Sequence, residues 1–330
     1  MYRHYSGNLR KAINTVFHDN VGAGLAPALK ANVSRFAAHK AYHATQIARR
    51  ERVDKTTGEI FPQDKTAKAT LAQFQAWQQA EYNTTVARAR TAKQWELYNE
   101  PDRLRLFPNI KWLPSGSAEQ RPEHQAFYNR IWAKDDPFWA TNTPGTLWNC
   151  KCGMQETDDD VTDNDNVKIS KPPLGLEGNP GITGEIFTEK ASYFQKAEVY
   201  GQTREEINSI CNKTILKDHK AWAAENLKGK KVTPAEFGRE IEFSNGGIKE
   251  YLDQPHDNYF AKNEMIRDIP HILKNATYRG VTEHKGRKSH IFEITITGKT
   301  NYLIANEHSG KGVVFYSVTA SNKVLIGIKK

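Results

Sequence analysis

Residues 289–297 read S-H-I-F-E-I-T-I-T, a run in which polar and apolar side chains alternate. Alternation with a period of two is typical of a β-strand that buries one face. His290 then shares a face with Phe292 and the two isoleucines that follow, whereas Ser289, Glu293 and the threonines line the other face. The stretch therefore predicts a strand whose histidine lies on the apolar side.

More strand-like segments surround this one. They are rich in β-branched and aromatic residues and are separated by short turn-forming sequences: 277–283, 300–306, 313–319 and 323–328. Two short helices are predicted upstream, at 246–253 and 266–276. This order predicts a small α+β domain over 233–330, with helices packed on a four- or five-stranded antiparallel sheet.

The N-terminal part has a different pattern. Apolar residues recur at spacings of three and four over 32–52 and 66–98, which predicts long helices. Residues 107–156 are rich in Pro, Trp, Asp and Gly, which predicts an irregular region. We therefore expect an α+β chain with a helix-rich domain over 1–195, a helical linker over 196–232 and the small C-terminal domain.

Composition narrows the functional classes. No apolar run approaches the ~18 residues of a membrane helix, and no apolar stretch follows the charged N-terminus, so neither a membrane partner nor a secretory signal is expected. Three cysteines are too few for a disulfide framework and indicate folding in a reducing cytoplasm. The net charge of +9 is compatible with nucleic acid or an acidic partner.

The sequence W-N-C-K-C at 148–152 suggests metal binding. Cys150 and Cys152 point to the same side of an extended segment, so both sulfurs can reach one ion. Zinc takes about four ligands, for which His124 is the third candidate. Asp135, Asp136 and water are candidates for the fourth. The alternative is that the cysteines and Trp148 are buried in a small irregular core.

Several motifs of this region occur together and in order: R-P-E-H (121–124), D-D-P-F-W (135–139), W-N-C-K-C and N-P-G-I-T-G-E-I-F (179–187). Over roughly residues 25–195 the chain resembles the Mu F-like head morphogenesis (minor capsid) family of tailed phages. The resemblance implies a virion-associated protein near the portal, made in the host cytoplasm, with portal and capsid proteins as partners. The cysteine region would then be structural, with or without zinc.

The C-terminal domain carries groups suited to RNA chemistry. It holds five of the eleven histidines. From Arg279 to the end of the sequence there are nine basic residues and three acidic ones. Cleavage by the RNA 2′-hydroxyl needs a base, an acid and cations near the phosphate, but no metal. We therefore expect no cofactor for such a nuclease.

Four segments of this domain carry a second resemblance: 244–256, 262–280, 284–294 and 310–319. Residues 233–330 resemble a phage-borne nuclease domain of the barnase–EndoU–colicin–RelE-like group. The resemblance implies a toxin-like endoribonuclease, RNA (including tRNA) as substrate and an immunity protein as a further partner.

The candidate catalytic residues are distributed over this domain. His256 and His290 form the expected acid–base pair, and Tyr316 or Ser317 orients the substrate. Glu293, on the opposite face of its strand from His290, is the alternative base. The expected nucleic-acid-binding residues are Lys262, Arg287, Lys288 and Lys311.

Two other functions remain open at this point. The chain can be a purely structural minor head protein whose last domain binds nucleic acid or portal without catalysis. A DNA-directed nuclease is the third interpretation, but no carboxylate cluster suited to Mg²⁺ is apparent over 233–330.

Overall fold

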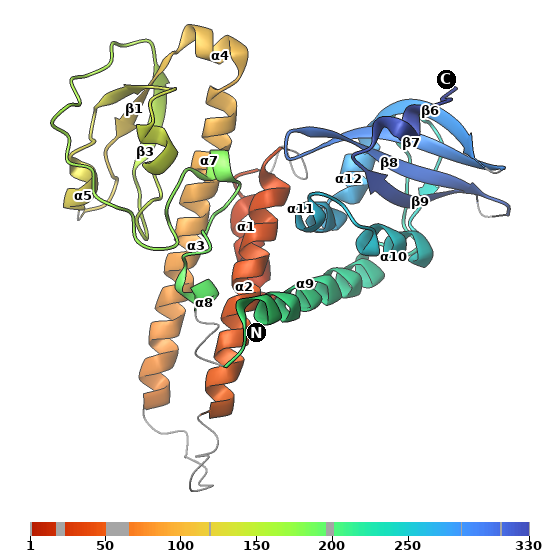
Figure 1. Ribbon diagram of the computed structural model, residues 1–330, viewed down its shortest axis with the longest axis horizontal. Helices are drawn as coiled ribbons and strands as arrows, with labels where there is room; N and C mark the ends of the chain where they lie inside the picture. Colours follow the sequence, from red (N-terminus) through yellow and green to blue (C-terminus); the bar gives the residue numbers. More distant parts are fainter. Residues whose placement is uncertain are drawn as a thin grey trace, which may run out of the picture. The chain divides into compact units, whose positions relative to one another are not determined.

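The computed structural model describes residues 2–17, 24–50, 66–118, 120–195, 201–284, 286–310 and 312–329, without the side chains of 47–50, 66–74 and 284. The chain forms two compact units, drawn in Figure 1. Unit 1 comprises Met1–Val16 and Asn32–Cys211, and unit 2 comprises Phe17–Ala31 and Asn212–Lys330. The α+β class is confirmed, since helices and two sheets are both present.

Three long helices begin unit 1: α1 (Tyr2–Asn14), α2 (Ala26–Arg50, from Asn32 onward) and α3 (Thr66–Tyr98). The predicted apolar positions Val33 and Phe36 of α2 are buried, as expected from their spacing. A buried ionic contact joins the helices, because Lys40 of α2 and the Tyr5 hydroxyl of α1 both donate to Glu81 of α3. Trp77 of α3 lies outside the core, since it is 49% exposed.

The Trp- and Pro-rich region of unit 1 is more regular than its sequence predicts. Its elements are α4 (Pro101–Leu106), β1 (Asn109–Leu113), α5 (Pro122–Gln125), β2 (Ile131–Ala133), α6 (Phe138–Thr141), β3 (Gly153–Thr157), α7 (Pro180–Thr183) and α8 (Ser192–Gln195). The three strands form an antiparallel sheet in the order β2-β1-β3. Aromatic rings fill its core, with Trp132 stacked on Phe138 at 4.0 Å between ring centroids. Strands of three to five residues are too short to show a clear period.

Unit 2 contains the remaining elements: α9 (Arg204–Asn226, from Asn212 onward), β4 (Lys231–Val232), β5 (Ile241–Glu242), α10 (Asn245–Asp253), α11 (Tyr259–Glu264), η3 (Met265–Arg267), α12 (Ile269–Lys274), β6 (Thr277–His284), β7 (Arg287–Ile296), β8 (Lys299–His308), β9 (Gly312–Thr319) and η4 (Asn322–Leu325). The sheet order is β4-β5-β9-β8-β7-β6. Strands β6 to β9 form the predicted antiparallel meander, and β5 adds to β9 in parallel.

The prediction of a fifth strand at 323–328 is wrong. The Ser321 side chain accepts a hydrogen bond from the Lys323 N–H and begins the 3₁₀ turn η4. Gly327 then adopts a φ of +72°, which a strand does not tolerate, and Ile326 is 77% exposed. Lys329 then pairs with Val281 of β6 in an isolated bridge.

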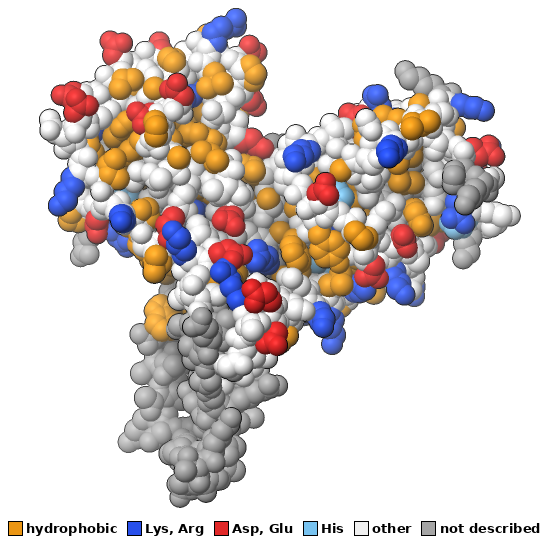
Figure 2. Space-filling model, in the orientation of Figure 1, with side chains coloured by type: hydrophobic (Ala, Val, Ile, Leu, Met, Phe, Trp, Pro, Cys, Tyr) orange, Lys and Arg blue, Asp and Glu red, His pale blue; other side chains and the backbone are white. Residues whose placement is uncertain are grey.

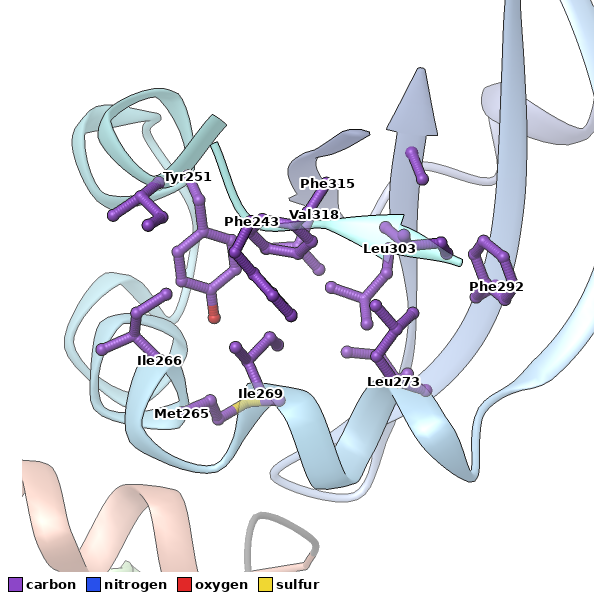
Figure 3. Close-up of a cluster of buried hydrophobic side chains, with 14 of the residues drawn as sticks. Phe243, Tyr251, Met265, Ile266, Ile269, Leu273, Phe292, Leu303, Phe315 and Val318 are labelled. Carbon is purple, nitrogen blue, oxygen red and sulfur yellow. The ribbon is translucent and has the colours of Figure 1, made fainter. Parts of the chain in front are cut away.

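The core of unit 2 lies between the helices and one face of the sheet (Figure 3). Phe292 of β7, Leu303 of β8 and Phe315 of β9 contact residues of α10, η3 and α12 in this core. Helix α9 contributes Ala223, and Leu227 follows directly after the helix in the same core. The residues predicted as a linker therefore include part of the packed core of unit 2, and the predicted boundary at 233 lies inside this unit.

Gly247→Ala is expected to destabilise the protein by about 1–3 kcal/mol, through overpacking. A Cβ at Gly247 of α10 would lie 1.9 Å from the Phe315 carbonyl oxygen on β9. Gly246→Ala is the matched control, since its Cβ would meet only the distant Ser244 hydroxyl. Chemical unfolding of both variants checks this, and equal stabilities would contradict it. Ser244 caps α10 by accepting a hydrogen bond from the Gly247 N–H, so residues 244–247 form the start of this helix.

Candidate functional site

Three potential metal ligands converge in unit 1. His124 lies in the one-turn helix α5, and Cys150 and Cys152 precede β3. The two sulfurs each lie 3.5 Å from the Nδ1 atom of His124. His124 and Cys150 are buried, Cys152 is half-buried, and the Trp112 ring packs edge-on against the imidazole. The sequence prediction that these three residues come together is therefore matched by their geometry.

Hydrogen bonds around His124 determine which ring nitrogen carries the proton. The Thr146 hydroxyl donates to the Thr143 carbonyl at 2.8 Å. Its oxygen, 3.3 Å from the His124 Nε2 atom, is therefore left to accept from that nitrogen. Nε2 carries the proton, and the lone pair of Nδ1 points to the two sulfurs.

The two thiols differ in acidity. A hydrogen bond from Cys152 lowers the pKa of the Cys150 thiol to about 4, against the effect of burial. The same hydrogen bond, together with burial, raises the pKa of Cys152.

The two candidate aspartates do not join this group. Asp136 accepts from the Phe138 N–H at 2.8 Å at the start of α6. Among the described residues, one group of His, Cys, Asp or Glu side chains could hold a metal ion, and its members are His124, Cys150 and Cys152.

A second polar group lies at the edge of the core of unit 2. It links β6, β7, β8 and the segment after β4. His290 of β7 is buried, and its Nδ1 and Nε2 atoms lie 2.9 Å from the Tyr278 hydroxyl and 3.1 Å from a Glu307 carboxylate oxygen. Arg239 donates to the same carboxylate at 2.9 Å. We call these four residues the Glu307 cluster.

The charge states within the Glu307 cluster follow from these contacts. The Arg239 hydrogen bond, and then the one from His290, lower the pKa of the Glu307 carboxyl. Burial lowers the pKa of His290, although Glu307 opposes this effect. Because a carboxylate only accepts, Nε2 of His290 carries the proton and the Tyr278 hydroxyl donates to Nδ1.

The Glu307 cluster reaches the surface on one side. The Glu307 side chain is 32% exposed and that of Arg239 is 52% exposed. A shallow pocket of ≈ 210 Å³ lies beside them, lined by Lys231, Arg239, Glu240, Glu242, Gly312 and Val313. Lys288, also exposed, is close enough for its charge to act on His290. A carboxylate, an arginine and a histidine are thus hydrogen-bonded together, and the charge of Lys288 acts on the histidine.

The two predicted catalytic histidines are not brought together. His256, in the loop before α11, bonds to Asn301 of β8 at 2.9 Å, whereas His290 bonds to Glu307 of the same strand. Six residues along a strand span about 20 Å. These histidines therefore do not reach one phosphate together.

Other candidate residues occupy different environments. Lys262 is fully buried and donates to the Tyr251 and Gln254 carbonyls, and burial lowers its pKa to about 8. It supports the end of α10 rather than facing solvent. Glu293 lies on the opposite face of β7 from His290, 3.5 Å from Arg279.

Four candidates remain. Tyr316 reaches Glu250 at 3.4 Å, and Ser317 is buried with no hydrogen-bond partner for its hydroxyl among the described residues. Arg287 is exposed at the start of β7, and Lys311 lies outside the described residues. On the face drawn in Figure 2, Lys and Arg side chains are interspersed with acidic ones.

Sequence reasoning missed three members of the Glu307 cluster: Tyr278, Arg239 and Glu307. The alternation of polar and apolar residues in 300–307 does not show on which face of the sheet Glu307 lies. That face follows only from the register of β8 with its neighbouring strands. Arg239 lies in a loop that carries no motif. Only the position of His290 on the apolar side of β7 was accessible from sequence.

Comparison with known proteins finds one family model and two curated relatives. The family Large polyvalent protein-associated domain 3 matches residues 212–316, which lie within unit 2. The chain is also 26% identical over 203 residues to the Mu-like prophage FluMu F protein of Haemophilus influenzae, covering 59% of this chain and 43% of that protein. It is 25% identical over 223 residues to the "Putative capsid assembly protein F" of Escherichia phage Mu, covering 55% of this chain and 49% of that protein.

This chain is similar to Mu F proteins. It spans less than half the length of either curated relative. No solved structure matches it. The resemblance of unit 2 to a nuclease is not supported by these comparisons and stays a prediction. No helix in the described part of the chain combines the length and the apolar composition needed to span a bilayer.

Proposed function

We propose that the chain is a phage head-associated protein that acts in capsid assembly. The observation that carries this proposal is the similarity to two F proteins, one of them named for capsid assembly, over more than half of this chain. The expected partners are portal and capsid proteins, and the expected location is the virion after assembly in the host cytoplasm.

Removal of the gene tests this role. In the phage or prophage that encodes the chain, a deletion should abolish DNA-filled heads seen by electron microscopy. The full chain supplied from a plasmid should restore them. Normal heads in the deletion strain would contradict the proposal.

We further propose that unit 2 cleaves RNA at the Glu307 cluster. A partly exposed carboxylate paired with Arg239, next to a histidine on which the charge of Lys288 acts, favours this activity. Glu307 would take the proton of the 2′-hydroxyl as its oxygen attacks phosphorus, and Arg239 and Lys288 would stabilise the phosphorane charge. The bond to the 5′-oxygen then breaks, and that oxygen takes a proton from solvent.

His290 acts as a positioning residue in this proposal. It is too buried to contact RNA, but its Nε2–H bond fixes the Glu307 carboxylate, and Tyr278 fixes the imidazole in turn. Such support holds a catalytic group in its productive geometry. An immunity protein that covers the exposed cluster would be the matching inhibitor.

Incubation of the full chain with total cellular RNA, tRNA included, in EDTA tests the activity. Products ending in 2′,3′-cyclic phosphate are the expected result. Cleavage of RNA or DNA that requires added Mg²⁺ would contradict the metal-independent mechanism. No cleavage by the folded chain would leave the purely structural role.

A further inference from the structure

We propose that His124, Cys150 and Cys152 bind one zinc ion in unit 1, with Nδ1 and two sulfurs as ligands and a water molecule in the fourth position. The site is independent of the proposed RNA cleavage. Its opening to water lies at Cys152, because this is the half-buried member of the group.

The distances fit tetrahedral zinc. With Zn–S near 2.3 Å and Zn–N near 2.0 Å, a tetrahedral angle places each sulfur about 3.5 Å from the nitrogen. Both sulfurs lie at 3.5 Å from the Nδ1 atom of His124. The three ligand atoms also lie within 4.8 Å of one another, so that one ion between them would reach all three.

The imidazole is prepared for a cation. Its Nδ1 lone pair lies 3.5 Å from each of two sulfurs, and one lone pair accepts only one hydrogen bond in good geometry. The opposite nitrogen donates to Thr146, which is the second contact that orients metal-ligating histidines. A cation satisfies the lone pair and both sulfurs at once, whereas hydrogen bonding does not.

A Cys150–Cys152 disulfide is the competing interpretation. Residues two apart close a very small ring, which strains the bond and makes it easily reduced. Zinc instead connects α5 to the segment that enters β3, and the protons remaining on the sulfurs pass to solvent when it binds. The aromatic core beside Trp112 would be held together by this link.

Metal content of the purified full chain tests the proposal. Elemental analysis should find about one zinc per chain in the wild type. After zinc is exchanged for Co²⁺, the protein should show thiolate-to-cobalt charge transfer and the strong visible bands of tetrahedral cobalt. Cys152→Ser should lose both signals. Cys211→Ser should keep both, since this buried thiol on α9 lies outside the group.

The wild-type measurements do not depend on how the variants fold. A folded wild-type chain that contains no zinc and takes up no Co²⁺ would overturn the proposal. So would an intact mass two hydrogens lighter that a reductant restores, because this identifies the disulfide. Full retention of zinc by Cys152→Ser would equally exclude the proposed ligand set.

Discussion

Arg88→Met is expected to lower the free energy of unfolding by about 3–5 kcal/mol, from the loss of four hydrogen bonds at about 1 kcal/mol each. Arg88 of α3 is fully buried. Its guanidinium donates to the carbonyls of Leu176, Glu177, Gly178 and Glu185, at 2.9 to 3.3 Å. Methionine fills much of the volume but leaves these carbonyls without a partner.

Two further contacts define the environment of Arg88. Burial lowers its pKa to about 10, opposed by the carboxylates of Glu177 and Glu185, so it stays charged at neutral pH. Gly145 packs directly on its stem, since a Cβ there would lie 2.7 Å from the Arg88 Cγ atom. The buried arginine thus holds the backbone on both sides of α7.

Urea unfolding of the full chain, followed by tryptophan fluorescence, measures this effect. Six of the seven tryptophans lie in unit 1, so the signal reports mainly on the unit that holds Arg88. Arg90→Met is the matched control, because Arg90 is exposed on the same helix. Equal unfolding midpoints for the two variants would show that the buried hydrogen bonds contribute little.

Glu307→Gln is expected to reduce RNA cleavage by about 10²–10⁴-fold, the usual contribution of a general base. The amide keeps the shape of the side chain but cannot take the 2′-hydroxyl proton. Because Arg239 holds the pKa of Glu307 below its ordinary value, wild-type cleavage should persist at a lower pH than a glutamate with the ordinary pKa of about 4.3 would allow. Initial rates on a defined RNA from pH 4 to 8 measure both effects.

Glu293→Gln is the control for this experiment. Glu293 lies on the opposite face of β7 and pairs with Arg279, outside the Glu307 cluster. Its replacement should leave the rate unchanged. The reverse pattern, with activity lost in Glu293→Gln and kept in Glu307→Gln, would move the active site to the other face of the sheet.

The sequence predicted those features that depend on local periodicity. The two-residue alternation of 289–297 placed His290 on the buried face of β7, where it is 4% exposed. The three- and four-residue spacing indicated α2 and α3. The segment at 323–328 has the composition of a strand, but a capped turn and the positive φ of Gly327 decide its conformation.

Features that depend on register and on long-range packing were not accessible. The contact between His290 and Glu307 arises from the pairing of β7 with β8, and Arg239 reaches it from a loop. Lys262 gives no sign in the sequence that carbonyls at the end of α10 will enclose it. By contrast, the spacing of Cys150 and Cys152 already constrained their sulfurs to one side.

The most direct test of the proposed role is the protein content of the phage head. DNA-filled heads purified from the phage or prophage that encodes the chain should contain it in a few copies, detectable by mass spectrometry after extensive washing. Heads formed in normal yield without the chain, while it remains in the soluble fraction, would contradict head association.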